Sequence, residues 1–112
     1  MSPPVLDRRL TLEEAQTVAD GAGGFTRSWV ALGTLWARIR PGSGGERGGD
    51  AATLSRAPYR IIVRAAPVGA PSRPRPEQRL REGDRVFRIL AVSDNDDAGR
   101  YLTCHAEEEV AT

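Results

Sequence analysis

The sequence contains no lysine, one cysteine and few aromatic residues, and each scarcity excludes a class of function. A phosphate-binding P-loop ends in Gly-Lys-Ser/Thr, so a chain without lysine cannot carry one. The lone Cys104 can form neither an internal disulfide nor a cysteine-rich zinc site. Two residues each of Trp, Tyr and Phe are too few for the aromatic platform on which single-strand nucleic-acid binders stack bases.

Long apolar runs and an excess of one charge are also absent. No apolar run approaches the roughly 18 residues that span a bilayer, and "MSPPVLDRRL" lacks the layout of a signal peptide. We therefore expect a cytosolic origin and no membrane contact. The 16 basic and 15 acidic residues leave a net charge of +1, which implies no general polyanion-binding surface. At 112 residues, we expect a single domain over residues 1–112.

Glycine, by contrast, is concentrated in "RPGSGGERGGD", residues 40–50. Glycine-rich loops can cradle phosphates, but a dinucleotide fingerprint that includes Gly42 and Gly44 needs a third glycine where Arg47 stands. No helix start follows the loop to supply an anion site. We interpret residues 41–56 as a flexible loop without nucleotide-binding function.

Alternating apolar and polar residues predict strands in much of the chain. In "YRIIVRA", Tyr59, Ile61 and Val63 share one face and arginines occupy the other, as in an antiparallel sheet with one solvated face. "RVFRILAV" is apolar on both faces, which predicts the most buried strand. "SDNDDAG" then predicts a turn, and "RYLTCHA" the returning strand of a hairpin.

Two earlier segments leave alternatives open. Residues 25–41 place Leu35, Ala37 and Ile39 opposite Trp36, and the internal Gly33 predicts a bulge or bend, giving two strands or one long bent strand. In residues 6–18, Thr11 and Glu14 match a helix capping box. The spacing of Leu6, Leu10 and Leu12 instead matches a half-buried strand.

Short strands separated by turn residues predict an all-β fold, a small antiparallel β-barrel or sandwich with a long glycine-rich loop. Residues 67–78 are rich in proline, so we expect an extended surface connection there. The polar residues 107–112 predict a frayed C-terminal tail.

No residue pattern indicates catalysis, a cofactor or a metal. Cys104 and His105 are adjacent, so on a strand they point to opposite faces and cannot form a nucleophilic dyad. "DNDDAG" resembles the start of a calcium loop, but its fifth position is Ala98 and its twelfth is His105 instead of glutamate. We therefore predict a protein that is not an enzyme and binds no cofactor or metal ion.

Four stretches together resemble bacteriophage head–tail connector proteins of the head-closure, or stopper, type. They are "LDRRLTL", "DGAGGFTRSWVALGTLWARIRP", "YRIIVR", and "GDRVFRILAV" with "GRYLTCHAEE". The neck of gene transfer agents, which are phage-like particles, uses a closely related part. The resemblance favours a strand over a helix for residues 6–18.

The resemblance implies a virion neck protein that is assembled in the bacterial cytoplasm. Copies would form a homo-oligomeric ring, hexameric or dodecameric, with portal or adaptor proteins above and tail-terminator or tail-tube proteins below. The ring would close the channel on packaged double-stranded DNA without reading its sequence, and would present the surface for tail attachment. The alternatives are a tail-terminator or other neck or tail-tube component, and a small nucleic-acid-binding β-barrel.

Two sets of residues carry this hypothesis. The first set would face the channel and would consist of Gly42, Gly44, Gly45, Glu46, Arg47, Gly48 and Gly49. The second set would anchor the core or the subunit interfaces and would consist of Phe25, Trp29, Trp36, Tyr59, Ile61, Val63, Phe87, Ile89, Leu90 and Tyr101.

Overall fold

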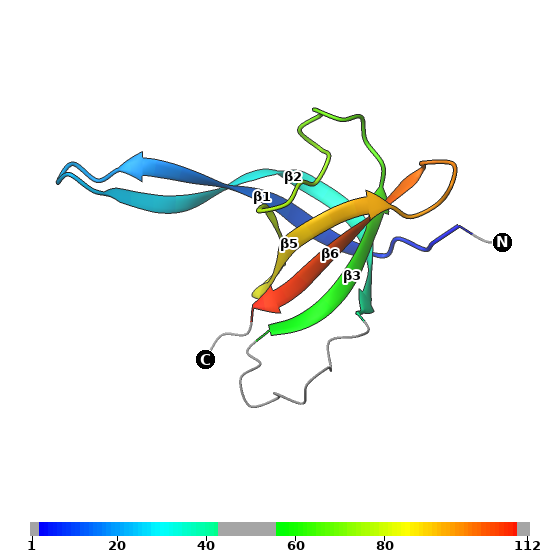
Figure 1. The fold of residues 1–112 in the computed structure, drawn as a ribbon. Coiled ribbons are helices and arrows are strands. Elements are labelled where there is room, and N and C mark those ends of the chain that lie inside the picture. The colour runs from blue at the N-terminus through cyan, green and yellow to red at the C-terminus, as the bar shows by residue number, and fades with distance from the viewer. Residues whose placement is uncertain (1–2, 43–55, 110–112) are drawn as a thin grey trace.

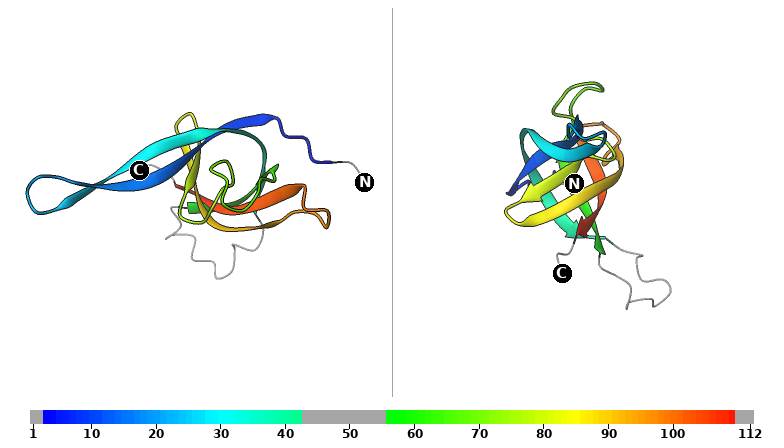
Figure 2. Two further views of the ribbon diagram at one scale, coloured as in Figure 1. Left: turned by 90° about the horizontal axis from the view of Figure 1, so that it is seen from above. Right: turned by 90° about the vertical axis from the view of Figure 1, so that its left-hand side faces the viewer.

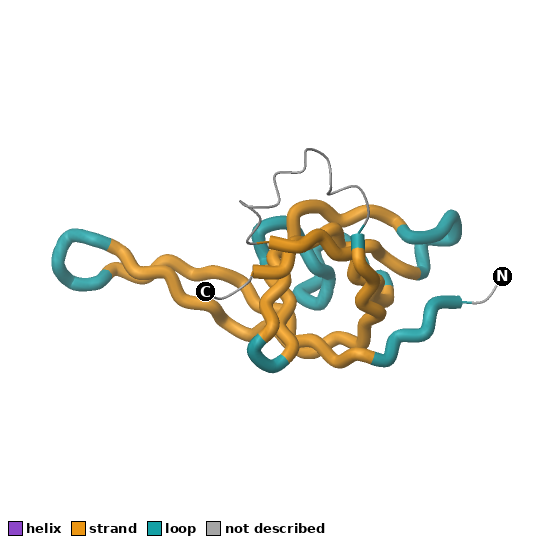
Figure 3. Tube along the Cα trace, turned by 90° about the horizontal axis from the view of Figure 1, so that it is seen from below, coloured by secondary structure: helices purple, strands orange, loops and turns teal. Residues whose placement is uncertain are grey.

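Six antiparallel strands form a closed barrel in a computed structural model that describes residues 3–42 and 56–109 (Figure 1). The strand order around the barrel is β1-β2-β3-β6-β5-β4, and the described residues contain only strands and loops (Figure 3). The predicted all-β fold is confirmed, and it is a barrel. The strands are β1 (Arg8–Ala19), β2 (Phe25–Pro41), β3 (Arg56–Arg64), β4 (Arg79–Glu82), β5 (Arg85–Asp94) and β6 (Tyr101–Glu109).

The ambiguous N-terminal segment is a strand. β1 pairs with β2 from Arg8 to Ala19 and with β4 from Thr11 to Glu13, which closes the barrel. Leu10 and Leu12 are buried in the core, as the strand periodicity predicted. The capping-box helix is wrong, because a helix would forfeit these two ladders and the burial of both leucines.

β2 is one long strand with a bulge beside Gly33, as the glycine predicted. Leu12 pairs with Gly33 and Glu13 with Ala31, so Leu32 is an extra residue without a partner in the ladder. Gly33 has φ +149°, a conformation that favours glycine. The bulge separates a barrel half of β2 from a half that projects with β1 beyond the barrel (Figures 1 and 2).

The core lies inside the barrel and draws side chains from every strand. Tyr59 packs edge-on against Phe87, with ring centroids 5.3 Å apart. Leu35 and Ile39 are partly buried against this core, while Trp36 is exposed, as their alternation predicted. The buried cluster consists of Leu10, Leu12, Ala37, Ile61, Val63, Leu80, Phe87, Ile89, Leu102, Cys104 and Ala106.

The prediction that the segment "RVFRILAV" forms the most buried strand is wrong. In β5, Ile89 pairs with Ala106 and Ala91 with His105, so Leu90 is the extra residue of a second bulge. The bulge turns Leu90 outward, where 48% of its surface is exposed, while Ile89 is fully buried. An alternation count cannot locate such an insertion.

The proline-rich connection and the C-terminal end also differ from expectation. The connection is not simply extended, because hydrogen bonds from Ala70 N to Pro67 O and from Arg73 N to Ala70 O fold it into turns. Within it, Pro74 and Gln78 are buried. Residues 107–109 are not frayed, because they pair with both β3 and β5. Residues 110–112 lie outside the described part of the chain.

Candidate assembly surfaces

The chemical groups that could suggest catalysis are separated. Cys104 is buried in the core, and burial raises the pKa of its thiol to about 12. His105 points outward, where its Nε2 lies 3.1 Å from Ser93 Oγ. The described residues contain no group of three His, Cys, Asp or Glu that could hold a metal ion. In the same part of the chain, no helix could span a membrane.

The most prominent surface feature is an arm formed by the outer halves of β1 and β2 (Figures 1 and 2). From Ala15 to Ala19, β1 pairs only with β2, over residues 25–29. At the tip, Asp20 Oδ1 accepts hydrogen bonds from the backbone of Ala22 at 2.8 Å and Gly24 at 3.0 Å. These bonds lower the pKa of Asp20 and give the turn a defined conformation.

The arm exposes apolar side chains to solvent. Phe25, beside the turn, is 71% exposed, and Val18 is 49% exposed. A two-stranded hairpin is marginally stable on its own in water, because each strand has one unpaired edge and both faces are solvated. The arm is therefore suited to packing against another chain.

Two sets of ionic contacts fix the base of the arm to the barrel. On one face, Glu13 is 4% exposed and pairs with Arg79 at 2.5 Å and Arg81 at 3.3 Å. Arg79 also lies 4.1 Å from the centre of the Trp29 ring, and Arg27 lies 5.1 Å from it. A charge as buried as Glu13 needs such partners, because an unpaired one would be strongly destabilising.

The proline-rich connection holds the other face of the arm's base. Glu14 Oε1 accepts hydrogen bonds from Arg75 at 2.5 Å and from Gln78 Nε2 at 3.1 Å. Gln78 is itself buried, and its Oε1 accepts a bond from the backbone N of Arg75 at 2.7 Å. Contacts on both faces hold the arm in one direction relative to the barrel.

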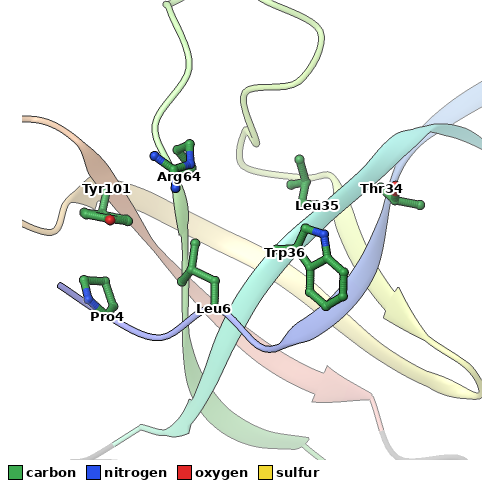
Figure 4. A pocket seen from close by; sticks show the side chains of 7 residues that line it. All are labelled: Pro4, Leu6, Thr34, Leu35, Trp36, Arg64 and Tyr101. Atoms are coloured by element: carbon green, nitrogen blue, oxygen red, sulfur yellow. The ribbon is translucent and has the colours of Figure 1, made fainter.

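A groove of about 580 Å³ lies between the N-terminal segment and β2, on the barrel side of the bulge at Gly33. The groove exists because β2 pairs with β3 only from Ala37 to Pro41. The part of β2 that precedes Ala37 diverges from β3. The N-terminal segment contributes Pro4 and Leu6 to it. The lining comprises Pro4, Leu6, Thr34, Leu35, Trp36, Arg64 and Tyr101 (Figure 4).

The groove combines apolar walls with one positive charge. Trp36 is 56% exposed, and the Arg64 guanidinium lies 5.7 Å from the centre of the Tyr101 ring. Within the described residues, Arg64 forms no ion pair with a carboxylate. The groove therefore offers apolar contact and a cation that has no acidic partner among the described residues.

At the end of the barrel where β2 stops and β3 begins, a chain of ion pairs ties the strands together. Arg8 donates to both carboxylate oxygens of Glu82, at 2.7 and 2.5 Å. Arg85 donates to both oxygens of Glu108, at 2.8 and 3.1 Å. The hydrogen bond from Arg8 lowers the pKa of Glu82, and that from Arg85 lowers the pKa of Glu108.

Only the first residue of the predicted channel-facing loop lies within the described part of the chain. Gly42 N donates to Pro58 O at 2.9 Å, and a Cβ at Gly42 would come within 3.1 Å of Pro58. Glycine thus permits the close approach of the two strand ends. Outside the described residues lie Gly44, Gly45, Glu46, Arg47, Gly48 and Gly49, so their predicted role stays a prediction.

The ten predicted anchors divide between the core and the surface. Ile61, Val63, Phe87 and Ile89 are buried, and Trp29, Tyr59 and Tyr101 are half-buried. The core role therefore does not hold for the three exposed residues, Phe25, Trp36 and Leu90. Phe25 and Trp36 lie on the arm and the groove, respectively.

Sequence reasoning missed the ionic contacts at the base of the arm. Glu13 and Glu14 contact residues 61 to 68 positions away, and the sequence carries no signal that links such distant charges. Glu13 and Glu14 sit beside each other in β1, and the strand alternation places them on opposite faces, where each finds a different partner.

Comparison with known proteins identifies relatives over nearly the whole chain. A chain of the "Virion of native gene transfer agent (GTA) particle" shares 58% sequence identity, with a TM-score of 0.79, over 97% of this chain and 100% of that one. A protein from Shigella flexneri 2a, solved in solution, is 23% identical over 96% of each chain, with a TM-score of 0.65, and supports the fold. No curated protein sequence matches the chain significantly. The family profile described as phage head completion protein matches residues 1–109, and the chain belongs to that family.

Proposed function

We propose that this protein is a structural component of the neck of a phage-like particle, where it completes the DNA-filled head. The observation that carries the proposal is the full-length similarity, at 58% identity, to a chain of a gene transfer agent virion. Its membership of the phage head completion family points to the same place in a particle. The proposed role is structural and includes no enzymatic step.

In this role, copies of the chain form a homo-oligomeric ring between the portal or adaptor proteins and the tail. The net charge of +1 lets copies pack side by side without strong mutual repulsion. The chain carries 16 basic and 15 acidic residues, and charges of both signs give register and specificity where they lie at subunit contacts. The ring's copy number, hexameric or dodecameric, stays a prediction.

The ring closes the DNA channel after packaging and presents the surface to which the tail attaches. Channel closure by residues 42–49 is a prediction from the sequence, since all but Gly42 lie outside the described residues. Both strands that flank this segment are held firmly, because Pro41 pairs with Tyr59 and Arg56 with Glu109.

Deletion of the gene in a strain that produces the particle tests the proposal. We expect heads that package DNA but then lose it and lack tails, measured as nuclease-protected DNA per capsid and by electron microscopy. Restoring the wild-type gene in trans should restore both measures. Tailed, DNA-filled particles from the deletion strain would show that the protein does not complete the head.

A further inference from the structure

We propose that the arm of one copy docks in the groove of the next copy in the ring. The arm is the β1–β2 hairpin beyond Glu13, with its tip at Asp20–Gly24. The groove is the site lined by Leu6, Trp36 and Arg64 with their neighbours (Figure 4). This inference rests on the proposed ring and names the contact that builds it.

The positions of the two surfaces suit a contact between copies. The molecule measures 56 × 39 × 22 Å, and the arm and the N-terminal segment that lines the groove lie at opposite ends (Figure 2). The braced base prevents the arm from folding back onto its own groove. A contact between two different surfaces of identical chains is heterologous, and such a contact generates a ring when the rotation closes.

The two surfaces are also chemically complementary. The tip presents Phe25, 71% exposed, as an apolar knob, and the groove presents Trp36 and Leu35 as apolar walls. The tip carries the carboxylate of Asp20, and the groove carries Arg64, which has no carboxylate partner within the described residues. Docking would bury the aromatic knob and bring opposite charges together, as in interfaces centred on an aromatic anchor.

A second copy is favoured over a different partner because one contact then satisfies both exposed surfaces of every chain. The arm, which is marginally stable as a lone two-stranded hairpin, is packed in each copy. The groove is filled in each copy as well. A different partner protein on the arm would require a second partner for the groove.

Crosslinking within assembled particles tests the contact. The variant Ala22→Cys/Thr34→Cys places one thiol at the tip and one in the groove, both at exposed positions. Cys104 needs no replacement, because it is fully buried and its pKa is raised to about 12. After treatment of purified particles with a short bismaleimide, we expect a ladder of covalent multimers of this chain on a denaturing gel. The control pair Ala22→Cys/Asp84→Cys, with its second thiol at the β4–β5 turn, should give monomers.

The outcomes separate this inference from the proposed function. Particles that contain the double-cysteine chain but yield no ladder overturn the docking contact and leave the neck function intact. A crosslink from the thiol at the arm's tip to a different virion protein also overturns it. If wild-type particles lack the chain altogether, the proposed function fails, and the docking contact fails with it.

A second variant keeps the inference testable should the cysteine pair disturb assembly. Phe25→Ser removes the knob from an exposed position, so the isolated protein should keep its melting temperature. The yield of tailed, DNA-filled particles should nevertheless fall by about tenfold or more, as expected for a central aromatic anchor. Val68→Ser, which removes a side chain that is 86% exposed but lies outside both surfaces, is the matched control and should leave the yield unchanged. Equal yields from both variants would refute the role of Phe25 as the anchor of the contact between copies.

Discussion

Alanine substitutions at Ile89 and Leu90 should have very different effects on stability, although the two residues are adjacent and nearly equal in size. Ile89 is fully buried, whereas Leu90 is 48% exposed because the bulge in β5 turns it outward. Ile89→Ala removes buried methyl groups and leaves a cavity inside the barrel, which costs about 2–5 kcal/mol. Leu90→Ala loses only part of a transfer free energy of about 1.5–3 kcal/mol and leaves no enclosed cavity, so we expect a loss of about 1 kcal/mol there.

Urea unfolding monitored by circular dichroism measures both free energies of unfolding. A difference of this size should appear in thermal melts as well, since about 1 kcal/mol shifts the midpoint by roughly 4–8 °C in a domain near this size. Equal losses at the two positions would refute the bulge and the inward orientation of Ile89. A larger loss at Leu90 would place the bulge elsewhere in the strand.

Three further predictions concern other parts of the barrel. The pKa values of Glu82 and Glu108 lie below the ordinary 4.5, so the stability they confer is present above about pH 4.5 and is lost as the pH falls below it. A Glu82→Gln/Glu108→Gln variant should be less stable at pH 7 and should lose less stability on acidification, and an unchanged pH profile would contradict the ion pairs. Cys104, fully buried and with a pKa raised to about 12, should react with a thiol reagent at pH 8 only when denaturant opens the barrel. Rapid labelling of the folded protein would contradict its burial. Gly33→Ala should cost about 1–3 kcal/mol because φ is +149° there, whereas the exposed Ser28→Ala on the same strand should change stability by no more than about 0.5 kcal/mol.

Local patterns in the sequence predicted most of the strands. The alternation of Tyr59, Ile61 and Val63 identified the inward face of β3, and Gly33 marked the bend in β2. The polar turn before Tyr101 placed the β5–β6 hairpin. These features depend on neighbours within a few residues, so hydrophobic periodicity and turn-forming residues are enough to predict them.

Features that depend on distant contacts could not be predicted from the sequence. Leu90 looks as apolar as Ile89, and only its position opposite β6 shows that it is the extra residue of a bulge. Residues 107–109 look like a polar tail, but the ladders to β3 and β5 hold them in the sheet. Glu108 adds an ion pair with Arg85, which stabilises this end of the strand.

The candidate surfaces were only partly predictable for the same reason. Phe25 and Trp36 stood out as aromatic anchors, yet the sequence could not tell which anchors would face the core. The arm depends on the pairing of β1 with β2 beyond the barrel, and neither strand's own sequence specifies how far that pairing extends. The groove needed the divergence of β2 from β3, which no local pattern encodes.

Electron microscopy of the neck of purified particles tests the proposed role most directly. We expect a closed ring of subunits between the portal side and the tail. The barrel formed by β1 to β6 should fit the density of each subunit, and each arm should extend to the adjacent copy. Finding this chain elsewhere in the particle, or finding a neck built without it, would contradict a role in head completion.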